Sequence, residues 1–236
     1  MNKDKLKTQG WEIITSGDLA KFDQTESLII KSINKILKLN KKNIRIKNIF
    51  DLKKNNSYLN YNIVNQIRQV YISDFAFQLT DIFSKRLIYL FGKDIFVQKF
   101  PTLRIHMGKK SVTSLSPHTE LMAGLSPYTF NLWIPFHNIE DSKGIWIIDI
   151  KDSLKIFKIY KYLKPNELML KIKKSKSFQF IHLKKGQSIL FNSFIFHGND
   201  QFSADDLRVS ADVRIQKYNS PFLFKSSEYF SYQKLK

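Results

Sequence analysis

The sequence predicts a mainly β protein, an antiparallel sandwich or jelly roll with N-terminal helices packed on one sheet. Two observations predict this class. Before about residue 95 apolar residues recur at helical spacing, and after it short apolar runs of strand length alternate with Gly, Pro, Asn and Ser. Seven or eight such runs favour antiparallel sheets. We interpret residues 1–236 as one domain, with a helical part at 1–94 and a β core at 95–236.

Two helices are predicted in the helical part. The first follows Asp23 and Thr25, and its apolar face consists of Leu28, Ile29, Ile33, Ile36 and Leu37. The second has its apolar face at Ile63, Ile67, Val70, Tyr71, Phe75, Leu79, Ile82 and Phe83. We expect the second helix to end at Gly92, because glycine favours the backbone conformation of a helix C-terminus. Both helices are predicted to be packing elements.

Seven strands are predicted in the core, at residues 95–100, 102–107, 128–136, 144–150, 178–183, 187–197 and 207–218. No helix is expected between them. A basic and aromatic insert at residues 151–178, broken by Pro165, interrupts the series, either as a lid over a pocket or as a surface excursion. Gly186 is expected in a turn just before one of the strands.

Composition excludes several classes of protein. The chain has no Cys, which excludes a disulfide-stapled scaffold and thiolate zinc sites. Its 20 Phe, 10 Tyr and 3 Trp argue against disorder. No apolar run approaches the roughly 20 residues that span a membrane, and the N-terminus lacks the order of a signal peptide, so we expect a cytoplasmic protein.

The chain is strongly basic, with 39 Lys and Arg against 20 Asp and Glu, a formal charge of +19. One interpretation is a solvated lysine surface. The other is that the positive field attracts an anionic partner, such as a nucleotide-linked substrate, nucleic acid or an acidic membrane face. Charge alone does not decide between these interpretations.

Three residues have the side chains of a metal site. His118 and Glu120 are two positions apart, a spacing that places side chains on the same side of a strand. His197 comes much later, where an apolar strand reaches a Gly-Asn turn. Two imidazoles and one carboxylate are the facial triad of Fe(II) sites, which leaves coordination positions open.

A polar strand face follows eleven residues after His197. Alternation between residues 208 and 214 places Arg208, Ser210, Asp212 and Arg214 on one face, with Val and Ala on the other. Such a face either binds a buried polar ligand or belongs to a water-exposed sheet. An arginine followed two residues later by a hydroxyl suits a carboxylate ligand. The guanidinium group binds the carboxylate bidentately, and the hydroxyl adds one further hydrogen bond.

In combination, His118-x-Glu120, His197 and Arg208-x-Ser210 resemble the Fe(II)/2-oxoglutarate-dependent oxygenases. The fold of that superfamily is the double-stranded β-helix, a cupin-like jelly roll. More narrowly, residues 60–216, chiefly SPYTFNLWIPF, resemble phytanoyl-hydroxylase-like oxygenases of bacterial surface-carbohydrate biosynthesis clusters. The resemblance implies a dioxygenase.

The resemblance implies roles for the matching residues. His118, Glu120 and His197 would hold Fe(II), and Arg208 with Ser210 would bind the distal carboxylate of 2-oxoglutarate, with O2 as the other cosubstrate. Oxidative decarboxylation would give succinate and CO2 and oxidise a substrate. The superfamily usually has Asp as its carboxylate ligand, so the Glu is a departure. Its presence disfavours the halogenating variant, which needs a vacant site for chloride.

Further positions are expected near the site. His106 stands where the family often supplies an amide to 2-oxoglutarate, so it is expected to bind the cosubstrate or to be a core histidine. Arg104 shares its strand face and is a candidate for substrate contact. Asn131 is expected to line the cosubstrate pocket. Tyr128, Trp133 and Arg214 are substrate candidates, with core packing the alternative for the tryptophan and pairing with Asp212 the alternative for the arginine. No role is assigned to His137 or His182.

The leading hypothesis is therefore an oxygenase that acts on an activated sugar or glycan precursor in bacterial surface polysaccharide synthesis. The expected partner is an anionic small molecule. A second hypothesis keeps the chemistry and places nucleic acid on Phe157, Tyr160 and Tyr162 among lysines, although we do not expect nucleic acid. A third is a non-catalytic cupin-like binding protein, which the presence of both Arg208 and Ser210 disfavours. The sequence leaves the oligomeric state open.

Overall fold

The fold was analysed in a computed structural model, which describes residues 5–36, 75–107, 116–140, 144–199, 207–222 and 227–236. The first described segment contains α1 (Lys5–Thr8), β1 (Trp11–Thr15) and α2 (Leu19–Ile36). Two further helices, α5 (Phe75–Asp81) and α6 (Ser84–Phe91), precede the core strands. None of the described helices is both long and apolar enough to cross a membrane.

The larger sheet contains seven antiparallel strands, in the order β1-β7-β4-β9-β2-β10, with β3 also paired to β9. Besides β1, its members are β2 (Asp94–Gln98), β3 (Thr102–Met107), β4 (Thr129–Pro135), β7 (Gln187–Asn192), β9 (Leu207–Lys217) and β10 (Phe230–Lys234). The long strand β9 pairs with β3 along its first half and with β2 near its end, so it lies at the centre of the sheet.

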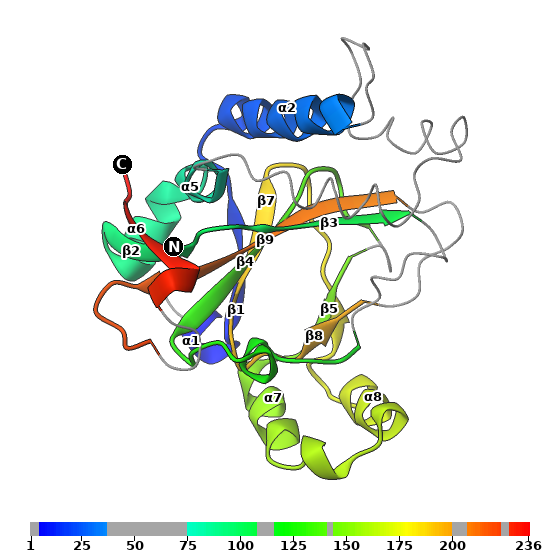
Figure 1. Ribbon diagram of the computed structural model, residues 1–236. Coiled ribbons are helices and arrows are strands. Elements are labelled where there is room, and N and C mark those ends of the chain that lie inside the picture. Colours follow the sequence, from blue (N-terminus) through cyan, green and yellow to red (C-terminus); the bar gives the residue numbers. More distant parts are fainter. Residues whose placement is uncertain (1–4, 37–74, 108–115, 141–143, 200–206, 223–226) are drawn as a thin grey trace.

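A smaller sheet lies against the larger one, in the order β6-β5-β8. Its strands are β5 (Trp146–Ile147), β6 (Gln179–Phe180) and β8 (His197–Gly198), and they are also antiparallel. Between the sheets Trp133, Ile189 and Phe191 pack with Ile147 and Ile195. The other face of the larger sheet is covered by helices α2, α5 and α6 (Figure 1).

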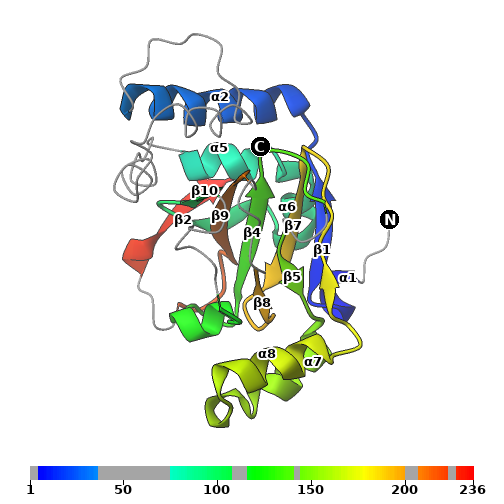
Figure 2. The same ribbon diagram turned by 90° about the vertical axis from the view of Figure 1, so that its right-hand side faces the viewer.

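The basic insert is helical. It contains α7 (Ile150–Phe157), the short 3-10 helix η4 (Tyr160–Tyr162) and α8 (Pro165–Lys173). Pro165 stands at the first position of α8, where its missing N–H costs nothing, and the Glu167 carboxylate accepts a hydrogen bond from the Lys164 N–H at 2.8 Å. In both views these helices form the end of the molecule opposite α2 (Figures 1 and 2).

Much of the predicted element order is present, since each of the seven predicted strand segments contains a strand. The expectation of no helices between strands is wrong, because the insert folds as α7 and α8. The 187–197 segment holds two strands in different sheets, β7 and β8, joined by a turn. Strands β1 and β10 were not predicted, and β1 lies within the part expected to be helical.

The second predicted helix is only partly described. Its residues 63–71 lie outside the described residues, and the remainder forms two helices, α5 and α6, separated at Ile82 and Phe83. Gly92 follows α6 with φ of +87°, as expected of a C-terminal glycine. Gly186 also has a positive φ, +86°, in the turn before β7.

Candidate metal centre and adjoining pocket

Three side chains converge where the smaller sheet meets the loop before β4. His118 and His197 are joined by a pair of backbone hydrogen bonds, 3.2 Å from the His118 N–H and 3.1 Å from the His197 N–H. Glu120 begins the 3-10 helix η2 (Glu120–Ala123), after Thr119, whose hydroxyl caps that helix. One ligand atom from each of the three residues lies within 4.8 Å of the others. Within the described segments this is the one such His, Asp and Glu group.

The backbone brings these three side chains together in a different way from the predicted one. The sequence analysis placed His118 and Glu120 two positions apart on a single strand. In the structure the strand pairing is a single bridge at His118, and Glu120 already belongs to η2. The chain turns between them, and this turn brings the carboxylate beside the two imidazoles.

Each histidine is held in a defined orientation by a backbone carbonyl. Nδ1 of His118 lies 2.8 Å from the Ser116 carbonyl oxygen, and Nδ1 of His197 lies 3.0 Å from the Ile195 carbonyl oxygen. Donation from Nδ1 leaves Nε2 as the lone-pair nitrogen, the form that binds a metal. Burial, with the neighbouring His118, lowers the pKa of His197 to about 3, so this imidazole is neutral at pH 7.

The Glu120 carboxylate is buried and held on both oxygens. Nη2 of Arg214 donates to both oxygens at 3.0 Å, and Nδ2 of Asn131 donates to Oε1 at 2.9 Å. Oε1 is also 3.7 Å from Nε2 of His197. Burial raises the pKa of Glu120, but Arg214 together with His197 and His118 outweighs burial and lowers the pKa below its ordinary value. The carboxylate is therefore ionised.

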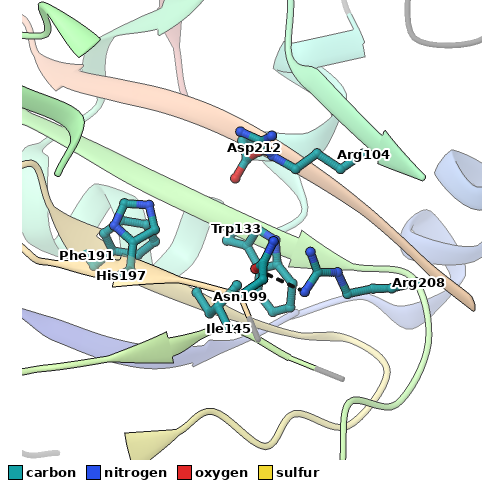
Figure 3. A pocket seen from close by; sticks show the side chains of 8 residues that line it. All are labelled: Arg104, Trp133, Ile145, Phe191, His197, Asn199, Arg208 and Asp212. Carbon is teal, nitrogen blue, oxygen red and sulfur yellow. Dashed lines mark hydrogen bonds and ion pairs between the residues drawn. The ribbon is translucent and has the colours of Figure 1, made fainter. Parts of the chain in front are cut away.

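A pocket adjoins the metal centre. Its lining residues are Arg104, Trp133, Ile145, Phe191, His197, Asn199, Arg208 and Asp212. Figure 3 shows His197 and Arg208 at opposite sides of this pocket, with Trp133 and Asn199 between them. The pocket thus has a histidine of the candidate metal centre on one side and a guanidinium group on the other.

Arg208 is completely buried at the far side of the pocket. Its Nη1 donates to the Gly144 carbonyl at 2.8 Å and to Oδ1 of Asn199 at 3.3 Å. Its guanidinium carbon lies 5.4 Å from the centroid of the Trp133 ring, a cation–π distance. Burial lowers the pKa of Arg208 to about 9, which still leaves it charged at neutral pH.

The polar face of β9 points inward. Arg208, Ser210, Asp212 and Arg214 are all buried, so the alternative of a water-exposed sheet is wrong. Val209, Ala211, Val213 and Ile215, on the opposite face, pack in the cluster beneath the helices. The polar residues therefore face the space between the sheets.

Two polar atoms are buried without a partner, one on Asn199, which lines the pocket, and one on Ser210, which follows Arg208 on the same strand face but is absent from the lining. Among the described residues, the Ser210 hydroxyl and Nδ2 of Asn199 make no hydrogen bond. Buried polar groups are normally satisfied, so these two atoms indicate a polar ligand. Asp212 instead pairs with Nε of Arg104. Burial raises the pKa of Asp212, but Arg104 and Arg214 lower it to about 2.

The structure places the other predicted site residues in three different situations. Arg104 and Trp133 line the pocket, whereas Asn131 and Arg214 contact Glu120 and are absent from the lining. Tyr128 is 49% exposed, outside the pocket. His106 belongs to β3, but its side chain lies outside the described part of the structure.

Three lining residues were not predicted from the sequence. The ring of Phe191 is tilted against that of His197, with centroids 4.5 Å apart, and Asn199 follows His197 by two positions. Ile145 lies just before β5. The Gly-Asn turn after His197 could have indicated Asn199 from the sequence. Nothing in the sequence distinguishes Phe191 and Ile145 from ordinary core residues. His137, to which no role was assigned, accepts a hydrogen bond from the Val209 N–H at 3.1 Å.

Comparison with known proteins establishes the fold. No protein-family model matches the chain, and no curated protein matches it. Solved structures do match. A non-heme monooxygenase, ThoJ, in complex with nickel, has a TM-score of 0.59 at 13% identity, covering 92% of this chain and 78% of that one. EctD from S. alaskensis with bound Fe has a TM-score of 0.59 at 10% identity, covering 94% and 81%.

A third match extends over almost the whole of both chains. SnoK, a non-heme alpha ketoglutarate dependent carbocyclase from nogalamycin biosynthesis, has a TM-score of 0.57 at 10% identity, covering 99% of this chain and 97% of SnoK. At such low identity these likenesses show a shared fold. The chain therefore has the fold of a class of non-heme enzymes that includes alpha ketoglutarate dependent members.

Proposed function

We propose that this protein is an Fe(II)- and 2-oxoglutarate-dependent oxygenase on a double-stranded β-helix core. The observation that supports it most is the pairing of a His-Glu-His group with a buried arginine across one pocket. The donor set fits Fe(II), because it offers two imidazoles with Nε2 available and one ionised carboxylate. In this proposal His118, Glu120 and His197 hold the iron.

The side chains that line the same pocket match the chemistry of a dicarboxylic keto acid. Arg208 carries a positive charge at the far side, and the unpartnered Ser210 hydroxyl lies two residues on along the same strand face. In this proposal both bind the distal carboxylate of 2-oxoglutarate, and Trp133 keeps the guanidinium oriented by packing on it. When bound, the iron and 2-oxoglutarate supply oxidation by O2. The protein chain itself binds and orients these two groups and excludes water from them.

Other residues support these groups. Asn131 and Arg214 fix the Glu120 carboxylate, so we propose that they position a metal ligand. Arg104, held by Asp212, is proposed to contact the part of the substrate or cosubstrate nearest to that side of the pocket. Tyr128 remains a candidate for substrate contact at the surface, and His106 remains one for cosubstrate contact.

The proposed substrate is an anionic sugar derivative used in bacterial surface polysaccharide synthesis. Two features support it: the resemblance of residues 60–216 to phytanoyl-hydroxylase-like oxygenases of such gene clusters, and the formal charge of +19, which attracts phosphate-bearing molecules. We further propose that the enzyme acts in the cytoplasm, where activated sugars are made.

Anaerobic titration with Fe(II) and then 2-oxoglutarate tests the proposal. We expect the weak visible charge-transfer band of a keto acid chelated to iron. Glu120→Ala should lose the metal, whereas Arg208→Met should keep it and need about 100-fold more 2-oxoglutarate, because a charge-assisted pair is lost. Arg86→Met is the matched control, since Arg86 pairs with Glu12 outside the pocket. Absence of the band in folded wild-type protein would contradict the proposal.

A further inference from the structure

The helical insert carries a concentrated positive charge. Residues 151–176 contain nine lysines, all exposed: Lys151, Lys155, Lys158, Lys161, Lys164, Lys171, Lys173, Lys174 and Lys176. The segment contains two carboxylates, and both have local partners. Asp152 accepts hydrogen bonds from the hydroxyls of Ser175 and Ser177, and Glu167 caps α8. The outer surface of α7, η4 and α8, which we call the basic hairpin, is therefore strongly cationic.

Large apolar side chains are exposed among these lysines. Tyr162 is 74% exposed, Leu170 56% and Leu154 40%. They are not needed to attach the basic hairpin, because a separate buried set does so: Ile156, Leu168 and Ile172 pack with Trp146, Ile148 and Phe196. The exposed residues do not belong to this buried set.

Helical spacing mixes the two kinds of side chain on one surface. Leu154 lies one turn from both Lys151 and Lys158, and Leu170 lies one turn from Lys173 and Lys174. At the tip, the Lys161 ammonium lies 4.9 Å from the centroid of the Tyr162 ring. Apolar side chains flanked by lysines are the composition of helices that lie in a membrane interface.

The basic hairpin is attached directly beside the metal centre. The Phe196 N–H donates to the Ser153 hydroxyl of α7 at 3.0 Å, and the rings of Phe157 and Phe194 are 6.0 Å apart. His197 follows Phe196 directly. A partner bound to the hairpin would therefore lie at the end of the molecule that carries the candidate metal site, away from α2 (Figures 1 and 2).

We propose that the basic hairpin docks on an anionic lipid bilayer. The lysines match acidic headgroups, and a tyrosine at a projecting tip suits the interface, where its ring is half buried and its hydroxyl hydrated. A nucleic acid would satisfy the lysines but not the leucines, because aliphatic side chains offer no stacking surface to bases. The two leucines therefore favour the bilayer. Docking would bring the metal centre close to lipid-linked molecules.

Vesicle co-sedimentation tests the proposal on the full chain. The vesicles are phosphatidylcholine alone, or phosphatidylcholine with phosphatidylglycerol in about a 7:3 ratio, which gives a negative surface. We expect binding to the mixed vesicles only. The charge variant Lys151→Gln/Lys158→Gln/Lys174→Gln should weaken partitioning about 100-fold, and Tyr162→Ser/Leu170→Ser about tenfold.

A matched control removes the same charge elsewhere. Lys93→Gln/Lys217→Gln/Lys234→Gln changes three exposed lysines near the β2, β9 and β10 edge, and should bind vesicles within about threefold of wild type. An equal loss in this control would show adhesion by net charge and overturn the proposal, as would no effect of Tyr162→Ser/Leu170→Ser. Binding of a mixed-sequence RNA oligomer without vesicle binding would also overturn it. Because the co-sedimentation assay contains no metal or cosubstrate, its outcome is independent of the proposed oxygenase activity.

Discussion

The Glu120 carboxylate is the most restrained group of the candidate metal centre. Its two oxygens accept hydrogen bonds from Arg214 and Asn131, and the whole residue is only 1% exposed. A glutamate has one more rotatable bond than the aspartate usual in the resembled superfamily, so it has more positions to adopt. The Arg214 and Asn131 contacts restrict that freedom, so the longer side chain is held in a fixed position.

Arg214→Met should destabilise the protein by about 3 kcal/mol, because it leaves a buried carboxylate without its cation. Glu120→Gln/Arg214→Met removes both charges and should recover part of that loss. Urea unfolding of the metal-free variants measures both values. Strictly additive losses in the Glu120→Gln, Arg214→Met and double variants would contradict the ion pair described here.

The ionisation of Asp212 should make the free energy of unfolding depend on pH in the acid range. Its pKa is lowered from 3.8 to about 2 in the folded protein, so its contribution is complete above about pH 4 and is lost as pH falls through about 2. The loss is about 2 kcal/mol. Asp212→Asn should flatten the curve of unfolding free energy between pH 4 and 2, while Glu140→Gln, at an exposed side chain, should leave it unchanged. Parallel curves for wild type and Asp212→Asn would contradict this reasoning.

The sequence predicted the residue types of the site better than their contacts. Alternation along β9 placed Arg208, Ser210, Asp212 and Arg214 on one face, and the structure brings His118, Glu120 and His197 together. The pairing of Arg214 with Glu120 joins residues 94 positions apart, and Arg104 meets Asp212 across 108 positions. Such contacts depend on strand register, which no local pattern contains.

At the scale of elements, β9 connects the helical layer to the site. Val209, Ala211, Val213 and Ile215 fill the core beneath α2, α5 and α6, and the buried polar residues between them face the space between the sheets. Since the side-chain period of a strand is two, a register shift of one residue would exchange the faces and bury arginines among the helices. The helical core therefore also fixes the positions of the polar residues.

Gly10→Ala should disturb the metal centre although the glycine is remote in sequence. Its φ is +80°, and an added Cβ would lie 2.7 Å from side-chain atoms of Ile150 and Ile195. We expect a loss of about 2 kcal/mol and weaker metal binding, because the Ile195 carbonyl orients His197. Gly17→Ala, which meets nothing within 4 Å, is the control. Calorimetric metal titration and urea unfolding measure both effects, and equal behaviour of the two variants would contradict them.

Local patterns also missed some elements. The short strand β1 stands among helices, and its five residues are too few for periodicity to identify. It is recognisable only from its pairing with β7. The helical insert was predicted as basic and aromatic but not as helical, because α7 and α8 have eight and nine residues and are stabilised by packing on Trp146 and Phe196.

At the scale of the whole molecule, metal binding should stabilise the fold. The ligands come from the loop before β4 and from the smaller sheet, so an ion would join segments about 80 residues apart. Mn(II) at about 100 times its dissociation constant should raise the unfolding free energy by about 2.7 kcal/mol, and a chelator should reverse it. Thermal unfolding measures the shift. A similar shift in Glu120→Ala would mean that the ion binds elsewhere.

The backbone bridge between His118 and His197 has a consequence for how an ion enters. Each imidazole is anchored to a carbonyl, and the two residues are hydrogen-bonded to each other through their main chains. Rotation of either imidazole would break its bond to the carbonyl, while the main-chain bonds keep the two backbones together. The two imidazoles are thus held in place by the protein itself, and a Glu120 oxygen that bound an ion would exchange its Arg214 partner for that ion. Capture of an ion would then involve this exchange of partners and the loss of the ion's water shell.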